Sequence, residues 1–211
     1  MTNRETQGKR MATNVLVIYY SSYGHTARMA QSVAEGARGA EPDVEVRVVR
    51  IPELEEARRA MSTQEWYVKA QEAHADIPEA TLDDLRWADG IIWGMPTRFG
   101  NMSAQVKQFI DTAGGLWFEG KLADKVVSGF TSASNPHGGQ ESTLLSLYNV
   151  FAHWGAILVT PGYTDPVLFE AGGNPYGASS TEEPNEQELA AARYLGRRVA
   201  EKAALLTGSR V

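Results

Sequence analysis

The chain has 211 residues, 43% of them hydrophobic, and a formal net charge of -6 at pH 7. This length fits one well-buried domain better than two, and the negative charge argues against nucleic acid as a partner. The absence of cysteine excludes disulfide bonds, thiolate catalysis and cysteine-bound metals.

The N-terminal segment is polar, beginning MTNRETQGKR, and lacks the apolar core of a signal peptide. We therefore expect residues 1–12 to form a disordered extension and residues 13–208 to form the folded domain. No apolar run approaches the length of a membrane helix, so the sequence predicts a cytoplasmic protein without an integral membrane segment.

The first apolar run, VLVIYY, breaks at residue 21 into the polar turn SSYGHT, and a helix-forming ARMA follows. A buried strand would deliver the hydroxyls of Ser21, Ser22 and Thr26, with free backbone N–H groups, to the positive end of a helix, where an anion can bind. The spacings of the Walker loop and of the G-x-G-x-x-G fingerprint are absent, which leaves a monophosphate such as that of FMN. From this stretch alone, an ordinary helix cap explains the pattern equally well.

Strand-like and helical patterns alternate along the rest of the chain. The further predicted strands are residues 44–49, 90–95, 125–132 and 156–160. This alternation predicts an α/β fold with a flavodoxin-like, doubly wound, five-stranded parallel sheet of order 2-1-3-4-5. Residues 52–80 are predicted to be an irregular excursion with one helix, and residues 161–184, rich in Gly, Pro and Ser, an insertion near the last strand.

The loops after the third and fourth strands would open on the same edge of the sheet as the first turn. In MPTRFGNM, which begins at Met95, N–H groups could meet the pyrimidine edge of a flavin and Arg98 could stabilise charge on its reduced ring. The alternative is a polar loop with Arg98 in an ion pair and Phe99 in the core. In SASNPHGG, which begins at Ser132, the amides could face a flavin, or the segment could be a plain strand-to-helix connection.

Two further side chains are ambiguous. Trp117, in TAGGLW at the end of a predicted helix, could stack on a planar substrate or pack in a core or subunit interface. His153 could contact the cofactor or simply complement the C-terminal dipole of its helix. The histidines show no i,i+4 pair and no H-E-x-x-H, so the sequence predicts no metal site.

Six motifs together resemble one known family: YYSSYGHT, MPTRFGNMS, TAGGLW, GGQE, FAHWG and NPYG, spread from Tyr19 to Gly177. The resemblance is to the WrbA-type flavoproteins, which are flavodoxin-like NAD(P)H:quinone oxidoreductases. PTRFGNM followed by GGLW distinguishes that family from small electron-carrying flavodoxins.

The resemblance implies bound FMN, NADH or NADPH as hydride donor, and two-electron, ping-pong reduction of a quinone to a hydroquinone by a homotetramer. It implies that Tyr23 also meets the nicotinamide nucleotide, that Trp117 lines the substrate face, and that Arg98 and His153 are catalytic. The FMN contacts it implies are Ser21, Ser22, Tyr23, Gly24, His25, Thr26, Thr97, Arg98, Phe99, Ser132, Ala133, Ser134, Asn135, Pro136, His137 and His153.

The chain departs from the family pattern at residues 132–137. The family usually has a glycine-rich S-T-G-T-G-G there, whereas Pro136 removes an amide donor and His137 adds a side chain. This altered loop leaves open an oligomeric scaffold that has lost the cofactor. The acidic net charge also suits an electron-carrying flavodoxin-like protein without its own NAD(P)H turnover.

Overall fold

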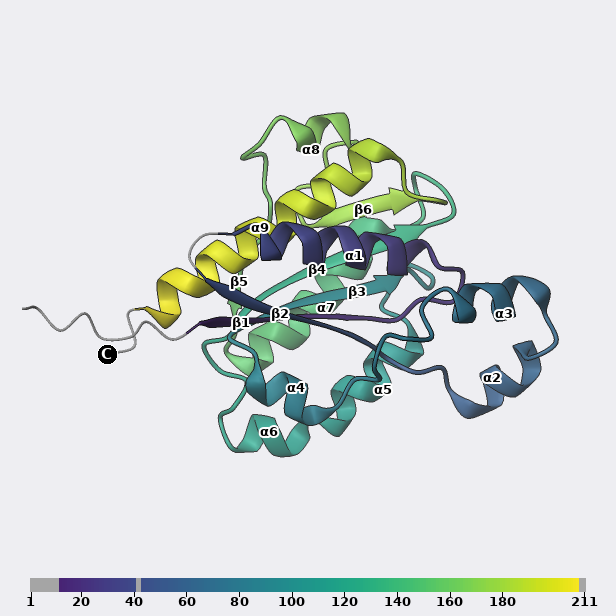
Figure 1. The fold of residues 1–211 in the computed structure, drawn as a ribbon, viewed down its shortest axis with the longest axis horizontal. Coiled ribbons are helices and arrows are strands. Elements are labelled where there is room, and N and C mark those ends of the chain that lie inside the picture. The colour runs from purple at the N-terminus through teal and green to yellow at the C-terminus, as the bar shows by residue number, and fades with distance from the viewer. Residues whose placement is uncertain (1–11, 41–42, 209–211) are drawn as a thin grey trace, which may run out of the picture.

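A parallel sheet runs through the centre of the molecule, with helices on both faces (Figure 1). The computed structural model describes residues 12–40 and 43–208, so nearly all of the predicted extension lies outside the described residues. The strands are β1 (Thr13–Tyr19), β2 (Val44–Arg50), β3 (Gly90–Pro96), β4 (Val126–Ala133), β5 (Ile157–Leu158) and β6 (Ala178–Thr181). The order β2-β1-β3-β4-β5 confirms the predicted doubly wound topology.

The edge of the sheet next to β4 differs from the prediction. β5 pairs with only two residues of β4, and β6 pairs in parallel with the later part of the same strand, from Phe130↔Ala178 to Ala133↔Thr181. The prediction of an insertion without regular structure over residues 161–184 was therefore wrong at residues 178–181, which form β6. Its residues, ASST, are small and polar, so they lack the apolar signal by which the other strands were found.

Helices cover the two faces in separate groups (Figure 1). One face carries α1 (His25–Arg38) and α9 (Glu186–Thr207), and α8 (Val167–Glu170) packs near them; the other carries α4 (Leu82–Trp87), α5 (Ala104–Thr112), α6 (Gly114–Phe118) and α7 (Gln140–Trp154). Each face of the sheet has its own hydrophobic core. Successive residues of β1 pack into one core and then the other, because successive side chains of a strand point to opposite faces. Val15 and Val17 pack on the α1 and α9 side, whereas Leu16 and Ile18 pack on the other.

The excursion after β2 contains two helices, α2 (Glu55–Met61) and α3 (Glu65–Glu72), not one. They project beyond the strand ends at the right of Figure 1. α2 has no buried residue and carries ion pairs from Glu55 to Arg58 and Arg59 instead. A helix without an apolar face leaves no periodic signal in the sequence, which explains the wrong prediction. Within the described ranges, no helix has the length and hydrophobicity needed to cross a bilayer.

His74, which follows α3, is buried against the end of β1. Its Nδ1 lies 3.3 Å from the Tyr19 hydroxyl, and burial followed by the nearby Arg50 lowers its pKa. The fold therefore favours neutral His74, and protonation of the unfolded chain below its pKa of about 6.5 favours unfolding.

We expect the free energy of unfolding to decrease as the pH is lowered from 7.5 to 5.5. His74 should account for up to about 1.4 kcal/mol of this decrease per pH unit. His74→Asn keeps a polar partner for Tyr19 and should lose that contribution, as chemical denaturation at both pH values would show. His137→Asn, at an exposed position, is the matched control and should retain the dependence. Equal pH dependence in wild type and His74→Asn would contradict the assignment.

Candidate functional site

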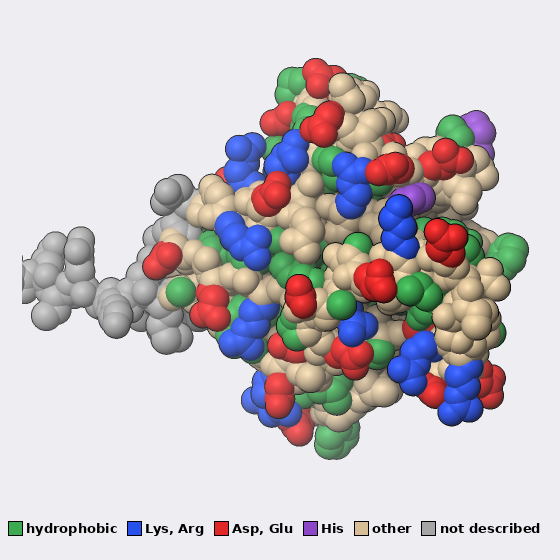
Figure 2. Space-filling model, turned by 45° about the vertical axis from the view of Figure 1, so that its right-hand side comes forward, with side chains coloured by type: hydrophobic (Ala, Val, Ile, Leu, Met, Phe, Trp, Pro, Cys, Tyr) green, Lys and Arg blue, Asp and Glu red, His purple; other side chains and the backbone are tan. Residues whose placement is uncertain are grey.

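A cavity of about 470 Å³ opens where β1, β3 and β4 end, a size typical of small-molecule sites. Figure 2 turns this end of the molecule forward and shows acidic and basic side chains interspersed over the surface. The local groups of the cavity, rather than a large charged surface, therefore decide what it binds. Its lining residues are Ser21, Ser22, Tyr23, His25, Thr26, Pro96, Thr97, Arg98, Ser132, Ala133, Ser134, Glu182 and Glu183.

The turn between β1 and α1 presents hydrogen-bond donors to the cavity. Gly24 adopts the left-handed conformation (φ 93°), and the Ser21 hydroxyl accepts hydrogen bonds from the N–H groups of Gly24 and Ala27 at 3.1 and 3.3 Å. Within the described part of the chain, the N–H groups of His25 and Thr26, at the start of α1, have no acceptor. Free donors at a helix N-terminus suit a phosphate, so this turn fits the phosphate end of FMN.

Hydrogen bonds connect the three loops at this edge. The hydroxyls of Thr26 and Ser132 lie 2.9 Å apart, and the N–H of Thr97 donates to the Ser132 carbonyl at 2.8 Å. Thr143 Oγ1, in the first turn of α7, donates to Thr97 Oγ1 at 2.6 Å. The loops after β1, β3 and β4 therefore form one connected wall.

Arg98 is the only Lys or Arg among the described lining residues. Its guanidinium donates to the Ser22 hydroxyl at 3.0 Å and to the Thr97 carbonyl at 3.0 Å. Of the ion pairs found within residues 12–40 and 43–208, none involves Arg98, so the alternative of a structural ion pair was wrong. A cation held beside neutral groups keeps its charge available to an anionic ligand.

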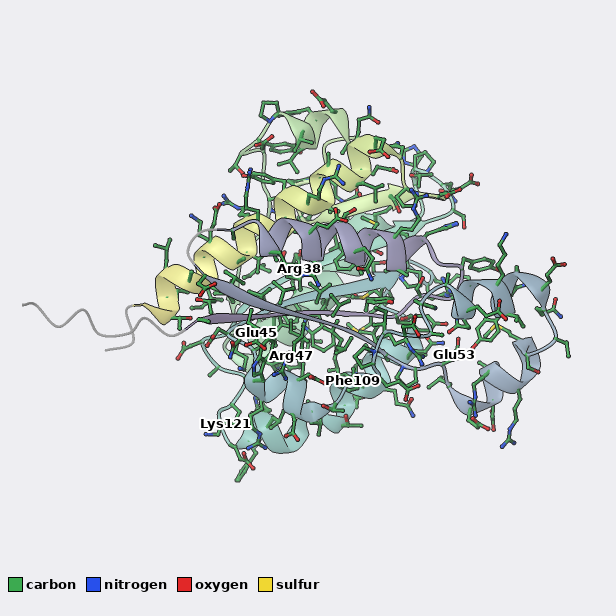
Figure 3. The ribbon with its side chains drawn as sticks, viewed as in Figure 1. Arg38, Glu45, Arg47, Glu53, Phe109 and Lys121 are labelled. Carbon is green, nitrogen blue, oxygen red and sulfur yellow. The ribbon has the colours of Figure 1, made fainter. Side chains whose placement is uncertain are left out.

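A second polar network joins the end of β1 to the excursion and to α5. The Tyr20 hydroxyl donates to the Glu53 carboxylate, and Gln105 donates to both, reaching the Tyr20 hydroxyl at 3.1 Å. Burial, and then the bond to Glu53, raises the pKa of Tyr20, so its hydroxyl remains a proton donor. Glu53, labelled in Figure 3, lies where the excursion leaves the sheet. This network was not predicted, because Tyr20 ends an apolar run and Glu53 lies in a segment without a regular sequence pattern.

Four of the predicted FMN contacts lie in the loops after β3 and β4 but do not line the cavity. Phe99 is fully exposed with φ 54°, a left-handed conformation that is unfavourable for an aromatic residue, so its predicted alternative position in the core was wrong. Asn135, Pro136 and His137 form an exposed turn, in which the His137 N–H donates to the Asn135 side chain at 3.1 Å. That amide is therefore already used within the loop.

Glu182 and Glu183 line the cavity and were not among the predicted residues. Glu182 has φ 56°, and its N–H donates to the Ala133 carbonyl at 2.7 Å; Glu183 forms an ion pair with Arg28 of α1. They follow β6, and because that strand was not predicted, their position at the cavity could not be predicted either.

Trp117 and His153 lie together but away from the cavity. α5 ends at Thr112, and Trp117 falls within α6, where its indole N–H donates to the His153 carbonyl at 3.0 Å. Both border a separate depression of about 220 Å³. α7 begins beside the cavity and reaches His153 near its far end, and its 15 residues correspond to about 22 Å. One copy of the chain therefore does not bring these two residues to the cavity.

The fold and the hydroxyl-rich cavity define a flavodoxin-like, mononucleotide-binding class of protein. Residues 13–164 match the sequence model of the family described as NADPH-dependent FMN reductase. A protein from Deinococcus radiodurans named NAD(P)H dehydrogenase (quinone) is 46% identical over 195 residues, covering 91% of this chain and 96% of the relative. A protein of the same name from Geobacter sulfurreducens is 44% identical over 210 residues, covering 92% and 100%.

Among solved structures, a WrbA-like flavodoxin from Agrobacterium tumefaciens is similar, with a TM-score of 0.65 and 31% identity over 91% of this chain and 98% of that one. The chain therefore belongs to the NADPH-dependent FMN reductase family, as a member of its WrbA type. This confirms the resemblance seen in the sequence motifs.

Proposed function

We propose that this protein is an FMN-dependent NAD(P)H:quinone oxidoreductase that converts NAD(P)H, a proton and a quinone into NAD(P)⁺ and a hydroquinone. The observation that carries the proposal is the cavity itself, where three hydroxyl-bearing loops meet the N–H groups of His25 and Thr26 and the guanidinium of Arg98. Among the described residues, those N–H groups have no acceptor and Arg98 has no carboxylate partner. It occurs in a chain whose relatives carry the name NAD(P)H dehydrogenase (quinone). Bound FMN supplies the redox chemistry, taking up hydride and passing on two electrons.

The residues of the cavity have separate proposed roles. The six residues from Ser21 to Thr26 hold the phosphate, and Thr97 with the loop from Ser132 contacts the ribityl chain and ring. Arg98 stabilises the negative charge that develops on reduction, because a fixed cation in a partly enclosed site acts more strongly than one in water. Phe99 and the turn at residues 135–137 lie farther out, and their contacts would form only against a bound cofactor or a second copy.

We further propose that Trp117 and His153 act in the cavity of a neighbouring copy within a homotetramer. The carrying observation is their joint placement outside their own chain's cavity, combined with the exposure of Trp117 (53%) and Phe99. Exposed aromatic residues are characteristic of subunit interfaces.

We also propose that the folded domain spans residues 13–208 and that the protein is located in the cytoplasm.

Subunit complementation tests this arrangement. We expect Arg98→Ala and Trp117→Ala each to impair quinone reduction when pure, and Trp117→Ala to retain FMN. Co-expression in mixed oligomers should restore turnover at roughly a quarter of the sites, those that combine an intact cavity with an intact neighbouring Trp117. Turnover per FMN in doubly tagged oligomers measures this, and activity that never exceeds the average of the two variants would contradict it.

Anaerobic stopped-flow reduction of the FMN-loaded protein by NADH and NADPH, followed by benzoquinone, tests the function directly. We expect rapid flavin bleaching by a nucleotide and rapid recovery of colour with the quinone. Bound FMN that neither nucleotide reduces would indicate an electron carrier. Colourless protein that fails to bind added FMN would indicate a scaffold.

A further inference from the structure

The excursion between β2 and α4 contacts four of the five residues from 19 to 23, which run from the end of β1 into the turn before α1. We call residues 21–26 the phosphate turn. These contacts join His74 to Tyr19, Glu53 to Tyr20, Gln71 to Ser21, and Trp66 to Tyr23. The Gln71 amide donates to the Ser21 carbonyl at 3.3 Å. The excursion is therefore fixed beside the cavity, although the proposed function assigns it no role.

The outermost of these contacts is an aromatic stack at the rim of the cavity. The rings of Trp66 and Tyr23 are nearly parallel, with centroids 4.2 Å apart and planes 13° from each other. Tyr23 lines the cavity, and the His25 ring lies 6.4 Å from it on the same turn. Trp66 remains 37% exposed and Tyr23 58% exposed. Large aromatic rings held in place yet open to solvent are suited to bind another planar group.

The two edges of the sheet place different side chains beside the cavity. Glu182 and Glu183 lie at the edge formed by β4 and β6, whereas the excursion leaves from β2 at the opposite edge. A nicotinamide dinucleotide carries a diphosphate and an adenosine beyond the ring that delivers hydride, so part of it must extend past a cavity already holding FMN. The exposed aromatic surface beside the cavity is on the excursion's side, where Trp66 stacks on Tyr23, so an adenine reaching past the cavity finds a planar partner there.

We propose that Trp66 binds the adenine ring of the nicotinamide dinucleotide, by stacking at the exposed rim beside Tyr23. The assignment rests on the proposed function, because it presupposes a nicotinamide donor. It makes Trp66 a specificity-determining residue that selects a dinucleotide over a shorter hydride donor. Stacking of a base on an aromatic side chain is strong enough to change affinity by roughly tenfold or more.

Binding of ADP-ribose to the FMN-loaded protein tests the proposal without turnover. ADP-ribose contains the adenine and diphosphate but no nicotinamide, and isothermal titration calorimetry reports its affinity. We expect Trp66→Ala to weaken it about tenfold and Trp66→Phe, which keeps an aromatic face, to restore most of the loss. Trp87→Ala, which removes a tryptophan of α4 that stacks with Arg47, is the matched control and should bind like wild type. Unchanged affinity in Trp66→Ala would overturn the proposal.

Reduced nicotinamide mononucleotide, which delivers the same hydride but has no adenosine, separates adenine binding from an indirect effect on Tyr23. We expect Trp66→Ala to lower kcat/KM for the dinucleotide about tenfold and to leave that for the mononucleotide unchanged, with FMN affinity and Tm as in wild type. An equal loss with both donors would assign Trp66 to support of the phosphate turn instead. Wild-type protein that oxidises neither donor would refute the proposed function, whereas the ADP-ribose experiment would still decide whether adenine binds at Trp66.

Discussion

Replacing Arg98 with alanine is expected to weaken FMN binding about 10- to 100-fold and to slow flavin reduction. Arg98 is the only Lys or Arg on the described cavity lining, and its hydrogen bonds go to Ser22 and Thr97 rather than to a carboxylate. Hydrogen bonds from a charged group contribute about 1.5–3 kcal/mol, and each 1.4 kcal/mol corresponds to a factor of ten. Fluorescence titration of the apoprotein with FMN measures the first effect, and anaerobic reduction by NADH the second.

Two variants separate the local role of Arg98 from the change in net charge. Arg98→Lys keeps the charge but lacks the forked guanidinium, so it should recover only part of the affinity. Arg38→Ala removes the same charge at the far end of α1, where the side chain is exposed (Figure 3), and should bind FMN like wild type. Normal FMN affinity and normal turnover in Arg98→Ala would leave the arginine with a purely structural role in its loop.

Replacing Gly196 with alanine is expected to destabilise the fold by about 3 kcal/mol. The backbones of α1 and α9 approach so closely that a Cβ on Gly196 would lie 1.9 Å from the Val33 carbonyl oxygen, and a Cβ on Gly36 would lie 1.8 Å from that of Arg193. Backbone atoms cannot move aside as a flexible side chain can, so the two helices would have to separate. For a domain of this size the change corresponds to a decrease in Tm of roughly 6–12 °C, measurable by calorimetry.

Gly115→Ala is the matched control for this substitution. Gly115 lies within α6, and a Cβ there would meet no atom within 4 Å. Alanine is favoured over glycine in a helix by about 1 kcal/mol, so this variant should be as stable as wild type or slightly more so. Similar Tm values for Gly196→Ala and Gly115→Ala would show that α9 can shift without cost.

The sequence was sufficient to predict the elements whose signal is local. Long apolar strands such as β1 and β3, each followed by an amphipathic helix, give the alternation that predicted a parallel, doubly wound sheet. The polar turns after them could be recognised because hydroxyls, glycines and a helix start occur together at Ser21 to Thr26. Sequence spacing predicted that these turns share an edge, since parallel strands end on the same side.

The features that could not be predicted depend on strand pairing or on the spatial arrangement of residues far apart in the chain. β6 is held by its hydrogen bonds to β4 rather than by apolar side chains, so Glu182 and Glu183 were missed along with it. The stack of Trp66 on Tyr23 joins residues far apart in the chain, and no periodicity records it. The separation of Trp117 from the cavity likewise follows from the length of α7, which the sequence could not relate to the position of a ligand.

Two short strands, β5 and β6, share the edge of the sheet beside β4, and this arrangement affects which sequence changes the protein can tolerate. β5 and β6 occupy successive positions along β4, so residues 159–177 leave the sheet and return to it without altering the register on either side. A segment inserted in this way can lengthen, shorten or be exchanged while the pairing of Leu158 with Val127 and of Ala178 with Phe130 in the sheet holds its two ends. We expect variation between related chains, and grafting of foreign segments in the laboratory, to be tolerated here more readily than at any loop that forms the cavity wall.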